Sequence, residues 1–315
     1  MATGKLIIGG ILLSLSLGPD GARAQDQVMP QAAFKSSVDL VRIAAIVRDS
    51  KGRFVQDLNV RDFEVLDEGR LRPISDLQSE LTGVSVAVLF DVSGSMEGQL
   101  PNAREAATHV LSWLDASRDE AAVFTFDTHL DERTPFTTGL RVLPESMSHV
   151  VPFGATSLHD AIAETAKKVG ARQGRRRAVV VMTDGADNAS HLKPEDVSAI
   201  ASVIDVPVYI FGIVPSIDNP ASDASTVSVA SVAFAGSLAD LAAWTGGHVF
   251  VASTPGQRSV AARQIIDELR HQYLIAFESS GKPGWHPLVV RARNKDLIVR
   301  ARSGYIAGQS RPAAH

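Results

Sequence analysis

Five short apolar runs that alternate with amphipathic segments constrain the fold of this chain more than any other feature. The runs cover residues 84–90, 121–126, 178–182, 206–214 and 249–252, and none of them carries a charge. Continuous apolar strands of this length are typical of a parallel sheet that is buried on both faces. Strands that alternate with helices build such a sheet. The sequence therefore predicts an α/β domain with a doubly wound, mainly parallel sheet.

The segments between these runs show the spacing of helices. Apolar residues recur every three or four positions over 103–114 and 158–169, which places them on one face of a helix. Lys193-Pro194-Glu195 puts a proline and an acid in the first turn of a third helix that extends to 204. A further helix is expected around 260–269.

Two fragments with the alternation of β-strands flank this α/β domain, which we place at 81–270. The first, over 36–80, alternates apolar residues from Val41 to Val47, and the second covers 271–308. Neither fragment is large enough to bury a stable core alone. We expect the two to pack into one small β-sandwich into which the α/β domain is inserted. Separate docking of each fragment onto the α/β domain is the alternative.

Residues 1–24 have the features of a secretory signal peptide. Lys5 is followed by an apolar run from Leu6 to Leu17, and Ala22-Arg23-Ala24 precedes the expected cleavage site. This run is shorter than the roughly 20 residues that a membrane-spanning helix needs. We therefore expect an exported protein, periplasmic or secreted, with no membrane span in the mature chain. An uncleaved N-terminal anchor is the alternative.

Composition excludes several other classes of protein. The chain has no cysteine, so it can form neither disulfides nor a lipid anchor attached through cysteine. Its formal net charge of -4 gives no basis for binding nucleic acid, which requires a basic face.

Three motifs follow predicted strands or precede a predicted helix and carry oxygen-bearing side chains. Asp91, Ser93 and Ser95 form a DxSxS pattern directly after the first apolar run, Thr156 precedes the 158–169 helix, and Asp184 lies just after the apolar run 178–182. Together these motifs resemble the metal ion-dependent adhesion site (MIDAS) of von Willebrand factor type A domains. The resemblance covers about 81–270, and all five positions of the site match. It implies a Rossmann-like fold that binds a protein ligand through a metal ion.

The chemistry of these five residues agrees with that resemblance. Two carboxylates and three hydroxyls make an all-oxygen set, which suits Mg²⁺ best among the candidates Mg²⁺, Mn²⁺ and Ca²⁺, whereas Zn²⁺ prefers His or Cys. The resemblance implies that an open coordination position takes a carboxylate oxygen from a protein partner. We expect metal-dependent protein binding, in adhesion or extracytoplasmic assembly. A metal that only stabilises the module is the alternative.

An enzyme is the less favoured reading. Asp91 after a first strand also resembles the nucleophile of haloacid dehalogenase-type phosphatases, but these need a second aspartate where this chain has Ser93. The chain has no G-x-S-x-G, no GxxxxGK[ST] and no HExxH motif. A metal-dependent hydrolase therefore stays only as an alternative. The segments DFEVLDEG and ARSGY, on either side of the α/β domain, also resemble bacterial exported proteins related to von Willebrand factor type A.

Residues near the five predicted ligands receive simpler interpretations. Ser157 is expected to cap the following helix, and His159 is expected at the surface. We expect Asp187 and Asn188 to lie in a solvated loop, with a second metal site as the alternative. The segment 215–236 shows little helical or strand pattern and leaves the metal-bearing edge of the sheet. It is expected either to border the site and shape partner choice or to be a surface insertion.

Overall fold

The structure is a computed structural model that describes residues 40–79, 83–172, 175–214 and 237–307. These residues all belong to one compact unit, 38–315. The expected signal peptide at 1–24, the first residues of the N-terminal β fragment and the segment 215–236 lie outside the described residues.

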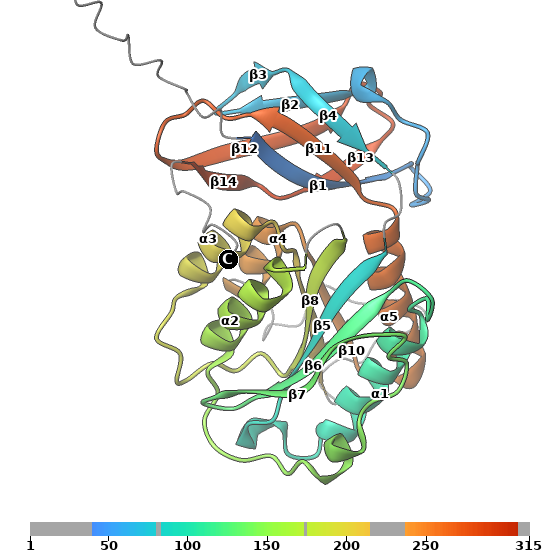
Figure 1. The fold of residues 1–315 in the computed structure, drawn as a ribbon, viewed down its shortest axis with the longest axis vertical. Helices are drawn as coiled ribbons and strands as arrows, with labels where there is room; N and C mark the ends of the chain where they lie inside the picture. Colours follow the sequence, from blue (N-terminus) through green and yellow to red (C-terminus); the bar gives the residue numbers. More distant parts are fainter. Residues whose placement is uncertain (1–39, 80–82, 173–174, 215–236, 308–315) are drawn as a thin grey trace, which may run out of the picture. The chain divides into compact units, whose positions relative to one another are not determined.

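A six-stranded sheet forms the centre of the α/β domain (Figure 1). In spatial order it contains β10 (Val249–Ala252), β9 (Val208–Ile213), β8 (Arg176–Thr183), β5 (Val84–Asp91), β6 (Glu120–Phe126) and β7 (Leu130–Thr138). All neighbouring strands are parallel except β6 and β7, which pair antiparallel. Strand order reverses between β5 and β8, and this is where open α/β sheets form ligand sites.

Helices cover both faces of this sheet. They are α1 (Leu100–Ser112), α2 (Leu158–Gly170), α3 (Pro194–Ile204), α4 (Ser237–Thr245) and α5 (Pro255–Arg270). Alternate residues of β5 belong to two separate cores, one shared with α1 and α5 and the other with α2, α3 and α4. The prediction of a doubly wound sheet is therefore confirmed. None of the helices in the described ranges is long and apolar enough to cross a membrane.

Strands from the two flanking fragments interleave in a β-sandwich. One sheet has the order β13 (Ile298–Ala301), β1 (Leu40–Arg48), β11 (Tyr273–Glu278) and β4 (Ile74–Gln78). The other has the order β14 (Gly304–Ala307), β12 (Gly284–Ala292), β2 (Phe63–Asp67) and β3 (Arg70–Arg72). Both sheets bury apolar residues in one common core. Because β1 pairs with β11 and β2 with β12, the two fragments form the predicted sandwich jointly rather than docking separately.

Some elements were not predicted from the sequence. Strand β7 contains Asp131, Glu132, Arg133 and Pro135, and most of its residues are at least partly exposed. Charged residues and proline are typical of an edge strand, whose free backbone groups must not pair with another chain. Because they interrupt the alternation of apolar residues, the hydrophobicity pattern does not reveal the strand. Short helix α4 and short strands β3, β4 and β14 were also missed.

Helix α5 connects the central sheet to the sandwich and is anchored at both ends. At its start, Thr254 and Gln257 form a capping box around Pro255. Near its end, the buried carboxylate of Glu268 pairs with Arg48 of β1, at 3.2 Å, and with Arg300 of β13. Glu268 therefore joins this helix to strands from both flanking fragments.

Replacing Glu268 by alanine tests this junction. We expect Glu268→Ala to lower the free energy of unfolding by about 2 kcal/mol, because two guanidinium groups lose a buried partner but stay partly hydrated. Asp267→Ala, the neighbouring substitution, removes only an exposed ion pair with Arg263 and should cost less than about 1 kcal/mol. Urea unfolding of both variants measures the difference. Equal losses would contradict the role assigned to Glu268.

Candidate metal centre

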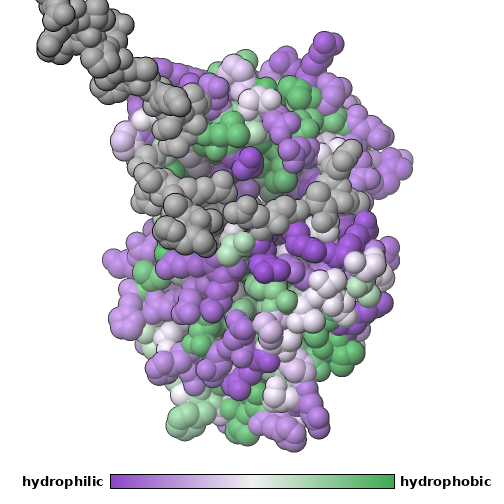
Figure 2. All heavy atoms as spheres, viewed as in Figure 1, coloured by the Kyte–Doolittle hydropathy of each residue, from purple (hydrophilic) through white to green (hydrophobic). Residues whose placement is uncertain are grey.

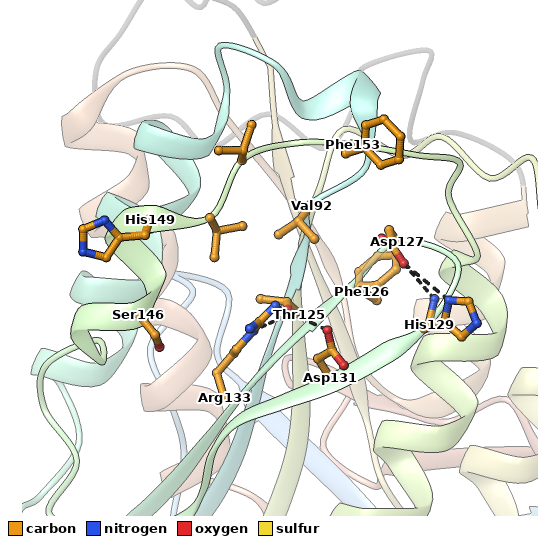
Figure 3. A pocket seen from close by; sticks show the side chains of 12 residues that line it. Val92, Thr125, Phe126, Asp127, His129, Asp131, Arg133, Ser146, His149 and Phe153 are labelled. Atoms are coloured by element: carbon orange, nitrogen blue, oxygen red, sulfur yellow. Dashed lines mark hydrogen bonds and ion pairs between the residues drawn. The ribbon is translucent and has the colours of Figure 1, made fainter.

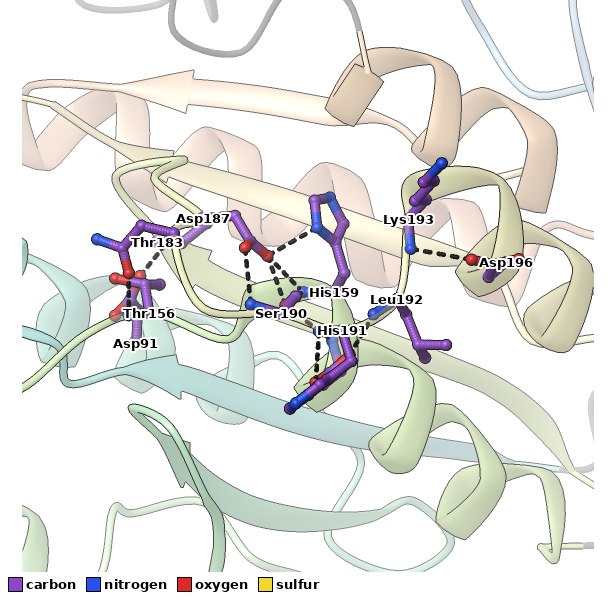
Figure 4. A network of polar contacts seen from close by, with 12 residues as sticks. Asp91, Thr156, His159, Thr183, Asp187, Ser190, His191, Leu192, Lys193 and Asp196 are labelled. Carbon is purple, nitrogen blue, oxygen red and sulfur yellow. Dashed lines mark hydrogen bonds and ion pairs between the residues drawn. The ribbon is translucent and has the colours of Figure 1, made fainter.

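The candidate centre starts from Asp91, the last residue of β5. All eight residues of this strand are buried, so the strand carries the carboxylate of Asp91 into the interior, where it is 0% exposed. One of its oxygens accepts hydrogen bonds from the backbone N–H of Ser93, at 3.0 Å, and from Ser93 Oγ, at 2.6 Å. The other oxygen accepts a bond from Thr183 Oγ1 at 2.7 Å (Figure 4).

This carboxylate lacks a compensating positive charge among its described contacts. Burial raises the pKa of Asp91 to about 6, against the opposing effect of the hydrogen bonds from Ser93 and Thr183, and the nearby charge of Asp184 raises the pKa further. All three hydrogen bonds come from neutral groups. A cation bound here would offset both the desolvation of Asp91 and its repulsion from Asp184. The electrostatics of the site therefore fit a metal ion.

Ser93 and Ser95 follow Asp91 on a tight turn. Residues Gly94–Met96 form a single turn of 3-10 helix, which brings the two serine hydroxyls to within 3.0 Å of each other. Ser93 is buried and Ser95 is exposed. The turn therefore places the hydroxyl of Ser93 in the interior next to Asp91 and that of Ser95 at the solvent.

Backbone hydrogen bonds bring the loop that carries Thr156 to this turn. Phe153 N donates to Val92 O at 2.9 Å, and Gly94 N donates to Gly154 O at 3.0 Å. Gly154 has a φ of +85°, in the left-handed region that favours glycine. Thr156, two residues further along, is 1% exposed. The loop therefore places a buried threonine hydroxyl beside the β5 turn.

A third loop, after β8, brings Asp184. Its backbone is joined to the Thr156 loop, because Asn188 N and Ala189 N both donate to Thr156 O at 3.0 Å, and Thr156 N donates to Asn188 Oδ1 at 2.8 Å. Asp184 is half-buried, and one of its oxygens accepts a bond from Ala186 N at 3.1 Å. All five predicted ligand residues thus lie on three mutually bonded loops at one edge of the sheet.

The donor set determines which ions suit this edge. Among the described residues, no three His, Cys, Asp or Glu side chains are grouped so that they could hold a metal ion. An ion at this edge would need the hydroxyls of Ser93, Ser95 and Thr156 besides the two carboxylates. Neutral and anionic oxygens of this kind favour Mg²⁺, Mn²⁺ or Ca²⁺.

A polar cluster beside these loops was not predicted. Asp187 is only 16% exposed in its side chain, and it accepts bonds from His159 N at 2.9 Å and from Ser190 Oγ at 2.7 Å. The imidazole of His159, 12% exposed, lies 2.7 Å from the same carboxylate (Figure 4). The expectations of a solvated Asp187 and a surface His159 were therefore wrong, because the loop after β8 folds over the start of α2.

The same loop also caps helix α2. Ser157 occupies the N-cap position, as predicted, but its side chain makes no capping hydrogen bond. Instead, Ser190 Oγ accepts from His159 N at 3.0 Å and from Asp160 N at 3.2 Å. A capping residue about 30 positions further along the chain leaves no motif in the sequence before the helix, so this cap cannot be predicted from the local sequence.

Comparison with known proteins identifies the family of the central part of the chain. Residues 86–186 match the family model described as von Willebrand factor type A domain. No curated protein sequence matches the chain.

Solved structures with a similar arrangement are distant in sequence. An aerotolerance-related membrane protein from Bacteroides fragilis is 19% identical, with a TM-score of 0.48 over 59% of this chain and 98% of that chain. A von Willebrand factor type A protein from Catenulispora acidiphila is 12% identical, with a TM-score of 0.44 over 87% of this chain and 74% of that chain. Proximal thread matrix protein 1 from the mussel byssus, with zinc in its MIDAS motif, is 18% identical, with a TM-score of 0.43 over 65% of this chain and 50% of that chain.

Removing the hydroxyl of Thr156 without changing its shape tests its contribution to ion binding. Thr156→Val should weaken Mg²⁺ binding by about tenfold, roughly 1.4 kcal/mol for one lost ligand, whereas Thr156→Ser should retain it. Thr165→Val is the matched control, because Thr165 is a buried threonine of α2 whose hydroxyl has no hydrogen-bond partner in the described structure. Titration calorimetry measures the affinities. An unchanged affinity in Thr156→Val would exclude Thr156 as a ligand.

Asp91→Asn tests whether an uncompensated charge is buried here. Burial raises the pKa of Asp91 in the folded state to about 6 from its ordinary value of 3.8, so the metal-free protein loses stability as pH rises through this range. That difference corresponds to at most about 3 kcal/mol. At pH 8 in EDTA, Asp91→Asn should therefore be more stable than the wild type, whereas Mg²⁺ should stabilise only the wild type. Thermal unfolding of both proteins with Mg²⁺ and with EDTA checks both expectations.

Proposed function

We propose that this chain, of which residues 86–186 form a von Willebrand factor type A domain, binds a protein partner through a divalent metal ion. The observation that carries the proposal is the buried carboxylate of Asp91, which meets neutral hydroxyls and a second acid but no cation among its described contacts. Asp91, Ser93, Ser95, Thr156 and Asp184 would hold the ion. We propose Mg²⁺ as the resident ion.

The exposure of the ligand residues supports an exchangeable position. Asp91, Ser93 and Thr156 are buried, whereas Ser95 is exposed and Asp184 is half-buried. An ion held from the inner side would keep its outer side open to solvent. With only two carboxylates to balance its charge, a bound ion supplies an electrophilic position that favours an acidic oxygen. We therefore propose that the partner presents an aspartate or glutamate carboxylate.

We propose binding rather than catalysis, because no histidine, lysine or amine bonds the serine hydroxyls at this edge in the described structure. A nucleophilic serine is usually activated by an adjacent histidine, lysine or amine that takes its proton. In the described structure, Ser93 Oγ donates to Asp91 and contacts Ser95 Oγ, and neither serine bonds an imidazole or an amine. A metal-dependent hydrolase remains the weaker candidate, and turnover of phosphate or carboxylic esters with Mg²⁺ would support it.

We place this binding outside the cytoplasm, in adhesion or in the assembly of extracytoplasmic complexes. The support is the sequence of residues 1–24, with Lys5, the apolar run and Ala22-Arg23-Ala24. A metal ion that only joins the three loops is the alternative. The backbone bonds between these loops favour it, since a bound ion would strengthen a contact that already exists.

An affinity capture from extracytoplasmic extract distinguishes these possibilities. The immobilised full chain should retain a specific protein in Mg²⁺ and release it in EDTA, and Asp91→Ala should retain nothing. Asp296→Ala is the control, because Asp296 is an exposed acid in the β12–β13 turn of the sandwich. If Mg²⁺ raises the unfolding temperature while no protein is retained in a Mg²⁺-dependent way, the metal is structural and the binding function is wrong.

A further inference from the structure

A cavity of about 320 Å³ opens directly beside the candidate metal centre (Figure 3). Val92, which stands between the predicted ligands Asp91 and Ser93, lines it. The backbone of Val92 makes hydrogen bonds to two other lining residues. Val92 N donates to Phe126 O and Val92 O accepts from Phe153 N, both at 2.9 Å. One residue therefore separates the cavity from the ion site.

One side of the cavity is apolar and open to solvent. Val150, Val151 and Phe153 line it on the loop that continues to Thr156. Phe153 is 78% exposed and Val151 is 76% exposed, which are the two largest exposures among the large apolar side chains of the described residues. Apolar side chains are visible at the lower end of the view in Figure 2, where β5 and β6 end. The cavity therefore has an aromatic and aliphatic rim.

The rest of the lining carries charge that is only partly balanced. Arg133 donates through Nε to Thr125 Oγ1 at 2.8 Å and pairs through Nη2 with Asp131 at 3.3 Å, so these two charges offset each other. Asp127 accepts a bond from the backbone of His129 at 2.8 Å. Its only ion-pair neighbour among the described residues is the exposed imidazole of His129, at 4.0 Å. Asp127 therefore contributes an acid that neither lysine nor arginine balances.

The carboxylate of Asp127 lies on the side of the cavity nearest the ion site. A Cβ added to Gly154 would lie 3.8 Å from Asp127 Oδ2, and Ser157 N donates to Asp127 O at 2.8 Å. The acid therefore adjoins the Thr156 loop at Gly154, the residue that follows Phe153. A carboxylate beside an aromatic ring suits a long basic side chain, whose stem packs on apolar surface and whose head bonds the acid.

We infer that the cavity binds a lysine or arginine side chain of the partner, close in sequence to the acidic residue that the ion binds. This inference rests on the proposed metal-dependent binding. The basic head reaches Asp127, and its stem lies across Phe153 and Val151. The acid and the base of the partner stand a few residues apart, because only Val92 separates the two parts of the site. Specificity then comes from the cavity, since the ion accepts any accessible carboxylate.

Selection from a displayed library of random peptides tests this inference without a known partner. The full chain is immobilised in Mg²⁺, and bound peptides are eluted with EDTA. We expect the eluted peptides to share an aspartate or glutamate, with a lysine or arginine within about four positions of it. Peptides that share the acid without a nearby base would overturn the inference and leave the proposed function standing. If no peptide is enriched by EDTA elution, both are wrong.

Substitutions in the cavity test the assigned contacts. Asp127→Asn keeps an acceptor for His129 N and removes only the charge, so it should weaken a selected peptide about fivefold to tenfold. Phe153→Ser, at an exposed position, should weaken the same peptide by about threefold to fivefold. Both variants should bind Mg²⁺ as the wild type does, and Asp296→Asn should match the wild type in both measurements. If Asp127→Asn bound the peptide normally, or still selected acid-and-base peptides, the inference would be overturned.

Discussion

The burial of strand β5 on both faces is the constraint on which the rest of the site depends. Its residues alternate between two helical layers, and its last residue, Asp91, keeps a carboxylate in the interior at the edge of the sheet. Moving a charge out of water is costly unless a partner compensates it. Three neutral hydrogen-bond donors contact this carboxylate, and they reduce that cost without removing it. A strand that only built the sheet would not end in such a residue.

The loops around Asp91 are joined mainly through their backbones. Bonds between Phe153 and Val92, between Gly94 and Gly154, and from two residues after β8 to Thr156 fix the spacing of the loops. Joining loops in this way leaves the hydroxyls of Thr156 and Ser95 available at the edge. Preorganised ligands of this kind lose little conformational entropy when an ion binds. The loop after β8 has a second task, since it also caps the start of α2 through Asp187 and Ser190.

A feature could be predicted from the sequence when the residues that form it lie close together along the chain. The buried strands of the α/β domain, its helices α1, α2, α3 and α5, and the DxSxS turn at Asp91 are local patterns and were predicted directly. The assembly of Thr156 and Asp184 with that turn required only that parallel strands end at one edge, together with the family resemblance. Contacts between distant loops were missed, such as that of Asp187 with His159. A hydrophobic periodicity in the sequence does not indicate a helix cap supplied by a residue about 30 positions away. It also does not indicate an edge strand as polar as β7.

The proposed function requires that recognition at this edge come from more than the ion. A divalent cation with an open position attracts carboxylates in general, so the ion alone cannot select one protein among many acidic surfaces. Selection requires neighbouring groups that reject most of these surfaces. The cavity of Val92, Asp127 and Phe153 supplies such groups, because an acid and an exposed ring disfavour a partner that offers only negative charge. In the proposed mode of binding, the negative charge of Asp127 would oppose the attraction of the ion for purely acidic surfaces, and affinity would be highest for a partner whose own charge changes sign between the ion and the cavity.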